Sequence, residues 1–120
     1  MKPGFYSIAQ AGGDQDPADD EAYGLAALTH FRDGQFVGVD PGGCKVSGEY
    51  RIDEDGRIAL HLNYDFRAGI ELANGTIFDR ATRLEADLVL APAAAEGEPQ
   101  PVNIGLGPMF NRLNWLADPI

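Results

Sequence analysis

The sequence predicts an all-β domain, an antiparallel up-and-down β-barrel of about eight strands that spans residues 1–120. Three dipeptides typical of hairpin turns stand between β-rich runs: Asp33-Gly34, Asp55-Gly56 and Asn74-Gly75. The runs between them alternate apolar and polar residues with a period of two. Turn signals recur about every 8 to 12 residues, as in sandwiches and barrels. Short hairpins between successive strands favour an up-and-down barrel over a Greek-key sandwich.

The central strands show the clearest alternation. Each places apolar side chains on one face and charged or polar side chains on the other. The inward sets are Val46, Gly48, Tyr50 and Ile52; then Ile58, Leu60, Leu62, Tyr64 and Phe66; then Leu84, Ala86, Leu88 and Leu90. A slip of one residue would bury the charged set, so we expect a well-defined register.

The remaining elements follow from composition and turn signals. Further strands are predicted at residues 4–10, 23–31, 35–39, 70–78 (interrupted by its own turn) and 102–106. The acidic loop 11–22 and the Ala, Pro and Glu-rich loop 91–101 are expected to hold no regular structure. The tail 108–118 has the apolar spacing of a short C-terminal helix, with Pro108 acceptable at its start. A barrel-closing strand is the alternative.

Charge and cysteine content limit the partners and the location. The formal net charge is -10, which repels nucleic acid and anionic lipid headgroups. Cys44 is the single cysteine, so no internal disulfide is expected. No signal peptide and no run of about 20 apolar residues is visible. We therefore expect a cytoplasmic protein with no membrane span and no direct contact with nucleic acid.

Residues that could carry chemistry are few. His30, His61 and Cys44 lack the spacing of metal ligands. The inward faces carry almost no titratable group apart from tyrosine hydroxyls. The sequence therefore predicts no enzyme, no catalytic residue, no metal and no cofactor.

An apolar barrel interior can be filled with side chains or can hold a small apolar ligand such as a lipid. A packed core is one interpretation and a carrier or sensor is the other. If there is a cavity, its lining is expected to be Tyr50, Ile58, Leu60, Leu62, Tyr64, Phe66, Leu84 and Leu88.

The acidic run Asp53, Glu54 and Asp55 lies at the tip of a predicted hairpin. It is either an ordinary polar turn or a recognition element for a basic protein partner, which would also need an apolar anchor such as Phe110 or Trp115. The apolar tail and the open strand edges favour a homodimer. The interface candidates are Met109, Phe110, Leu113 and Trp115.

The order of motifs in residues 3–66 resembles the GrlR-like family of negative regulators of type III secretion. The motifs are Gly4-Phe5-Tyr6-Ser7-Ile8, Gly24, Asp33-Gly34 followed by Phe36, Gly38 and Asp40, Gly48-Glu49-Tyr50, and Asp53-Glu54-Asp55 leading into Arg57 to Tyr64. The resemblance implies a lipocalin-like barrel, usually dimeric and without enzymatic activity, that restrains a transcriptional activator by binding it.

The resemblance also implies a contact site. The family's regulator from attaching pathogens contacts its partner through four exposed acids, Glu-Asp-Glu-Asp, in the corresponding hairpin. Only Asp53, Glu54 and Asp55 match that run, because Ile52 occupies the first position and Gly56 follows.

Overall fold

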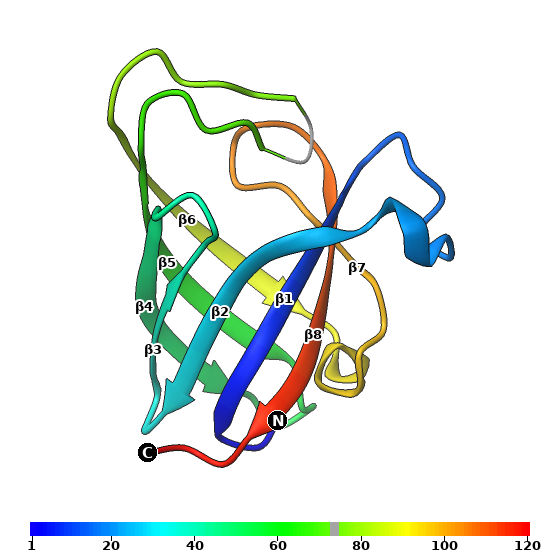
Figure 1. Cartoon of the computed structure of the whole chain (residues 1–120). Helices are drawn as coiled ribbons and strands as arrows, with labels where there is room; N and C mark the ends of the chain where they lie inside the picture. The colour runs from blue at the N-terminus through cyan, green and yellow to red at the C-terminus, as the bar shows by residue number, and fades with distance from the viewer. Residues whose placement is uncertain (73–74) are drawn as a thin grey trace.

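The structure, a computed structural model, describes residues 1–72 and 75–120. Those residues form an antiparallel, nearly closed barrel with almost no helix, which confirms the predicted fold class (Figure 1). The elements are β1 (Gly4–Gly12), η1 (Asp20–Ala22), β2 (Gly24–Arg32), β3 (Gln35–Val39), β4 (Lys45–Ile52), β5 (Ile58–Phe66), β6 (Thr82–Leu90), η2 (Pro92–Glu96), β7 (Gln100–Val102) and β8 (Met109–Ala117).

The strands form one sheet in the order β6-β5-β4-β3-β2-β1-β8-β7. The chain runs up and down from β1 to β6, and β8 then returns to pair with β1 on the side opposite β2. In the described part of the chain no ladder joins β6 to β7, so the barrel has a seam there. The short 3-10 helix η2 connects these strands and packs against β8. Its Ala94 is fully buried.

The tail is a strand and not a helix. Residues Met109–Ala117 pair with β1 along almost its whole length, from Phe5↔Ala117 to Gly12↔Met109. Without β8, β1 would leave a row of backbone N–H and C=O groups unpaired. The helical spacing of apolar residues is therefore overridden by the open edge of β1.

Several predicted elements need correction. Residues 70–78 are not a strand: their described part makes one isolated bridge, Glu71↔Ile77. Asn74 of the predicted Asn74-Gly75 turn lies outside the described residues. The seventh strand lies at Gln100–Val102 and not at 102–106.

The two long loops also differ from expectation, since each contains a short 3-10 helix. In the first, the Asp19 side chain caps η1 by accepting the backbone N–H of Glu21. In the second, η2 runs from Pro92 to Glu96 and is capped by Gly97, which has a positive φ of 86°.

The hairpin turns confirm one prediction and refine another. Asp33 and Gly34 both have positive φ, 54° and 78°, as a type I′ turn requires. At the next hairpin, positive φ occurs at Gly56 but not at Asp55. The Asp53 carboxylate accepts the N–H groups of Asp55 and Arg57, at 3.0 and 2.9 Å, so a longer loop replaces the two-residue turn.

The predicted inward faces form the core. Buried members of the cluster include Tyr6, Phe31, Phe36, Val46, Ile58, Leu62, Leu90, Met109 and Leu113. Ile52 is the exception among the predicted inward residues: it is 41% exposed because it ends β4 beside the turn. The inward residues Leu84, Ala86 and Leu88 of edge strand β6 are half-buried. One end of the barrel, with both termini, carries the turns after β2 and β4 and the loop with η2, whereas the other end carries loop 11–22 and residues 67–72 and 75–81 (Figure 1).

Candidate functional site

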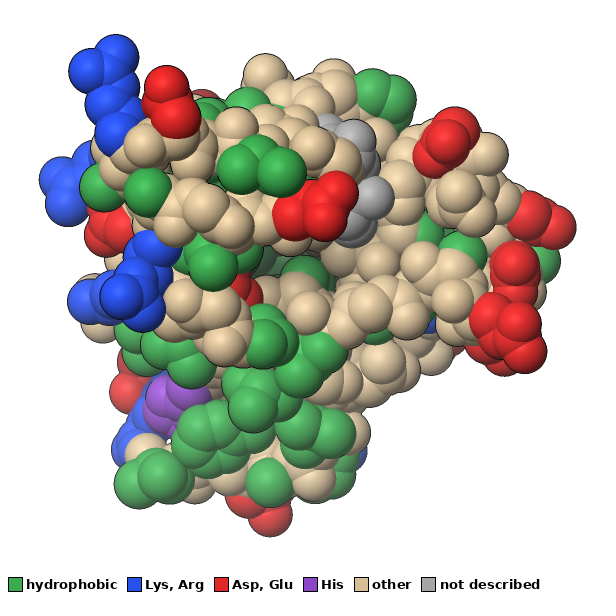
Figure 2. Space-filling view, turned by 45° about the horizontal axis from the view of Figure 1, so that its top comes forward, with side chains coloured by type: hydrophobic (Ala, Val, Ile, Leu, Met, Phe, Trp, Pro, Cys, Tyr) green, Lys and Arg blue, Asp and Glu red, His purple; other side chains and the backbone are tan. Residues whose placement is uncertain are grey.

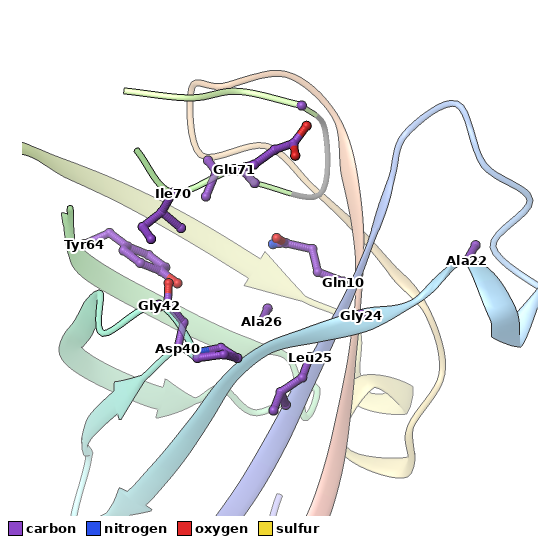
Figure 3. Close-up of a pocket in the computed structure, with 13 residues that line it drawn as sticks. Gln10, Ala22, Gly24, Leu25, Ala26, Asp40, Gly42, Tyr64, Ile70 and Glu71 are labelled. Carbon is purple, nitrogen blue, oxygen red and sulfur yellow. The ribbon is translucent and has the colours of Figure 1, made fainter. Parts of the chain in front are cut away.

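A cavity of about 540 Å³ opens at the loop-bearing end of the barrel, which we call the mouth. It lies between the start of β2, the turn after β3 and residues 70–72 and 75 (Figure 3). Its described lining is Gln10, Ala22, Gly24, Leu25, Ala26, Asp40, Pro41, Gly42, Tyr64, Ile70, Glu71, Leu72 and Gly75. Figure 2 shows the hollow, with acidic side chains at its margin.

A second, smaller cavity of about 80 Å³ lies in the barrel interior. Its lining is almost entirely apolar and includes Phe31, Phe36, Val46, Leu60, Leu62, Leu88 and Leu113. Gln10, Ala26 and Tyr64 line both cavities, so the two adjoin at these three residues. Polarity therefore falls from the mouth to the interior.

A β-bulge places Ala26 at this junction. Pairing between β1 and β2 passes from Ile8↔Ala27 directly to Ala9↔Leu25, which leaves Ala26 as the extra residue. A bulge breaks the alternation of faces, so both Ala26 and the buried Ala27 reach the interior cavity. Two small side chains at this point leave the passage open.

Asp40 is held at the mouth by the turn that joins β3 to β4. Its backbone N–H donates to Cys44 O at 2.9 Å, and its Oδ1 accepts the Cys44 N–H at 2.7 Å. Gly43 completes the turn with a φ of 85°. These bonds fix the carboxylate in a half-buried position before any ligand arrives.

Tyr64, near the end of β5, reaches the same wall of the mouth. Burial raises the pKa of its hydroxyl, and the neighbouring Asp40 carboxylate, to which it is hydrogen bonded, raises that pKa further. The hydroxyl therefore stays protonated and acts as a donor to Asp40.

Residues 67–72 and 75–81 extend across the mouth (Figure 1). Gly69 N donates to Phe78 O at 2.9 Å, and Leu72 N donates to Thr76 O at 2.9 Å. Ile70 lies so close to Gly42 that a Cβ on Gly42 would come within 2.8 Å of Ile70 Cδ1. Glu71, which belongs to these residues, also lines the mouth (Figure 3).

Two further polar groups face the cavities. Gln10 Nε2 donates to Asn111 Oδ1 at 3.0 Å, which leaves the Gln10 Oε1 atom free to accept. Thr29 is 1% exposed and lines the interior cavity, and its Oγ1 has no hydrogen-bond partner among the described residues. A buried hydroxyl without a partner is costly, so this group is a natural contact for a molecule in the cavity.

The structure brings half of the sequence-predicted cavity residues to the interior cavity. Leu60, Leu62, Tyr64 and Leu88 line it. Ile58 and Phe66 are buried outside its described lining, Leu84 is half-buried on β6, and Tyr50 packs edge-on against Phe31 with ring centroids 5.3 Å apart. The interior is thus largely packed, and most of the open volume lies at the mouth.

The acidic run lies at the opposite end of the barrel. Asp53, Glu54 and Asp55 are exposed at the tip of the β4–β5 hairpin. Asp53 shapes its own turn by accepting two backbone N–H groups, whereas the Glu54 and Asp55 side chains make no such contact with any residue that the structure describes. The turn interpretation therefore accounts for Asp53 alone.

The predicted interface residues divide into two pairs. Met109 and Leu113 are 1% and 3% exposed because they lie in the core of the chain itself. Phe110 is half-buried on the outer face of the sheet, whereas Trp115 is half-buried on the inner face and packs against the core. Trp115 donates its Nε1–H to Pro3 O at 3.2 Å and carries Lys2 Nζ 3.6 Å from its ring centroid.

The histidines and the cysteine lie outside both cavities. His61 faces outward on β5, where Nδ1 is 2.6 Å from Asp87 and Nε2 is 2.8 Å from Glu85. His30 packs against the Phe5 ring at 4.5 Å. Cys44 is buried, and its Sγ accepts the Arg67 N–H at 3.1 Å. Among the described residues, no group of three or more His, Cys, Asp and Glu side chains is arranged to hold a metal ion.

Sequence reasoning missed Gln10, Ala26, Thr29, Asp40 and Glu71. Thr29 alternates with the buried Ala27 and Phe31, so the period of two could have placed it inside. Asp40 and Glu71 lie in loops, and no local pattern marks them as neighbours.

The fold and the cavities define a small β-barrel with an open, partly acidic mouth. Neither a family model, a curated protein nor a solved structure matches the chain. The resemblance to the GrlR-like family therefore stays a prediction. None of the helices in the described ranges has the length and apolar character needed to cross a membrane.

Proposed function

We propose that this protein is a non-enzymatic binding protein that holds a small amphipathic molecule at the mouth of its barrel. The observation that carries the proposal is the junction of the two cavities at Gln10, Ala26 and Tyr64. A mouth of about 540 Å³ lies within the ~300–1,000 Å³ range of small-molecule sites. The polar part of the ligand stays at the mouth and its apolar part enters the interior.

The size of the interior cavity limits the ligand. At about 80 Å³ it is smaller than the ~150 Å³ apolar cavity that takes up benzene. A short aliphatic group fits there, whereas a long acyl chain does not. This argues for a compact ligand and against a long-chain lipid.

The test is a titration of the ¹⁵N-labelled protein with hexan-1-ol, a neutral amphipathic probe. We expect saturable amide shifts at Gln10, Ala26 and Tyr64. Ala26→Phe fills the junction and should abolish them, while Ala59→Phe, which adds the same ring on the outer face of β5, should not. Thermal unfolding checks that both variants fold. Shifts that do not saturate, or that persist in a folded Ala26→Phe variant, would contradict the proposal.

A second function rests on Glu54 and Asp55, whose exposed carboxylates lie at the end of the barrel away from the cavity. We infer that they contact a basic protein partner, as the resemblance to negative regulators of a transcriptional activator implies. Projecting charges speed encounter and reject wrong partners. Such binding and ligand uptake are compatible, because they use opposite ends of the barrel.

Affinity capture from the native organism tests this second function. Glu54→Lys with Asp55→Lys should lose a basic partner, and Asp53 is kept because it holds the turn. Glu96→Lys with Glu98→Lys makes the same charge change at other exposed acids and should retain it. Equal capture by both double variants would exclude the tip as the contact.

A further inference from the structure

The charges at the mouth are of one sign. Its described lining contains two carboxylates, Asp40 and Glu71, and no Lys, Arg or His. Arg67 stands outside this lining, exposed, with Nη1 3.3 Å from Gly42 O. In Figure 2 the Lys and Arg side chains gather at one edge of the view, away from the hollow. A carboxylate or phosphate in the mouth would find no countercharge there.

The hydrogen-bonding groups at the mouth are mainly acceptors. The Tyr64 hydroxyl donates to Asp40, and one of the two N–H groups of the Gln10 amide donates to Asn111. Among the side chains of the described lining, the two carboxylates, the Gln10 amide oxygen and the second Gln10 N–H remain, so acceptors outnumber donors. A ligand group that donates hydrogen bonds and carries positive charge matches this lining.

Thr29 provides an independent polar contact deeper in the barrel. Its Oγ1 is buried and unpartnered in the described structure, and it lines the interior cavity. Thr29 on β2 pairs with Gly38 on β3, which precedes Asp40 by two residues along the chain. Two residues of strand correspond to about 6–7 Å, so the two polar contacts are a short aliphatic spacer apart.

We propose that the ligand is a compact primary amine. Its ammonium group binds at the mouth between Asp40 and Glu71, and a hydrogen-bonding group at its other end reaches Thr29. The inference rests on the proposed function, because it names the ligand class for the same cavities. The preformed Asp40 turn makes the ammonium contact without rearrangement.

The test compares probes of matched length: hexylamine, hexan-1-ol and hexanoate, titrated by calorimetry at neutral pH. Hexylamine should bind about tenfold more tightly than hexan-1-ol, with hexanoate weakest, and added salt should reduce the advantage of the amine. Hexanoate binding as tightly as hexylamine would overturn the amine proposal but leave the proposed function standing. No binding by any of the three would overturn both.

Isosteric variants locate the ammonium contact. Asp40→Asn keeps an oxygen that accepts from Cys44, so the turn should persist while the advantage of hexylamine over hexan-1-ol falls to about twofold or less. Glu71→Gln should reduce that advantage by a smaller factor, since Glu71 is exposed. Glu96→Gln removes the same charge from an exposed residue away from the mouth (Figure 1) and should change nothing. An undiminished advantage in a folded Asp40→Asn variant contradicts the assignment.

A separate experiment tests the contact with Thr29. In the wild type, 6-aminohexan-1-ol should bind at least as tightly as hexylamine, because its hydroxyl meets Thr29. In Thr29→Val the amino alcohol should bind about tenfold more weakly than hexylamine, since its hydroxyl is then buried without a partner. A preference between these two probes that is the same in both proteins would rule out Thr29 as the inner contact.

Discussion

The hydroxyl of Tyr64 is hydrogen bonded to the carboxylate of Asp40 at the mouth of the barrel, where the end of β5 meets the turn after β3 (Figure 3). Burial and this carboxylate raise the pKa of Tyr64 above its value of 10.0 in the unfolded chain. The proton is therefore bound more tightly in the folded state. The resulting stability is complete below about pH 10 and is lost as the pH rises through the folded pKa.

Tyr64→Phe should consequently flatten the alkaline decline in stability. We expect the free energy of unfolding of the wild type to fall more steeply than that of the variant between about pH 9 and pH 12. Urea unfolding at a series of pH values measures both curves. A parallel decline would show that the pKa of Tyr64 is not raised in the folded protein.

A glycine in the middle of β4 makes a close backbone approach. A Cβ built on Gly48 would lie 1.9 Å from His61 O on the neighbouring strand. Because the obstacle is backbone, Gly48→Ala should cost about 3 kcal/mol or more of unfolding free energy. Chemical denaturation gives the value, and Ser47→Ala, one residue away, should cost about 0.5 kcal/mol or less.

The three acids at the hairpin tip should differ in their effect on stability. Asp53→Ala removes the acceptor for two backbone N–H groups and should lower the unfolding free energy by about 1 kcal/mol. Glu54→Ala should change it by less than about 0.5 kcal/mol. Urea denaturation of the two variants makes the comparison, and equal losses would argue against the turn assignment.

The His61 imidazole on β5 contacts the carboxylates of Glu85 and Asp87 on β6, and this contact depends on pH. The hydrogen bond to Asp87 is the largest effect that raises the pKa of His61 above 6.5, and Glu85 adds to it. A raised pKa stabilises the fold at low pH, and this contribution is lost as the pH rises through the folded value. NMR titration should show the pKa falling in Asp87→Asn, and by less in Glu85→Gln. A larger fall in the second variant would reverse the assignment.

Cys44 should react slowly in the folded protein. It is fully buried, and burial raises the pKa of its thiol, so little thiolate is accessible. Alkylation by iodoacetamide at neutral pH should be slow without urea and fast in the unfolded protein. Rapid modification under native conditions would mean that the turn around Cys44 opens readily.

The sequence determined most of the strands and their inward faces. The period of two is a local property, so residues 35–39 were predicted with the same bounds that the structure gives to β3, and the alternating inward set from Ile58 to Phe66 lies in β5. Leu60, Leu62, Tyr64 and Leu88 were likewise assigned to the interior from their own strands.

Only the tertiary structure decided how the barrel ends and where its cavity lies. The tail forms β8 because β1 has an open edge to pair with. The spacing of apolar residues in the tail carries no information about that edge. Gln10, Thr29, Asp40 and Glu71 come from separate segments, and their proximity depends on long-range pairing and on the bulge at Ala26. Alternation reports which side a residue faces, whereas barrel closure determines which residues meet.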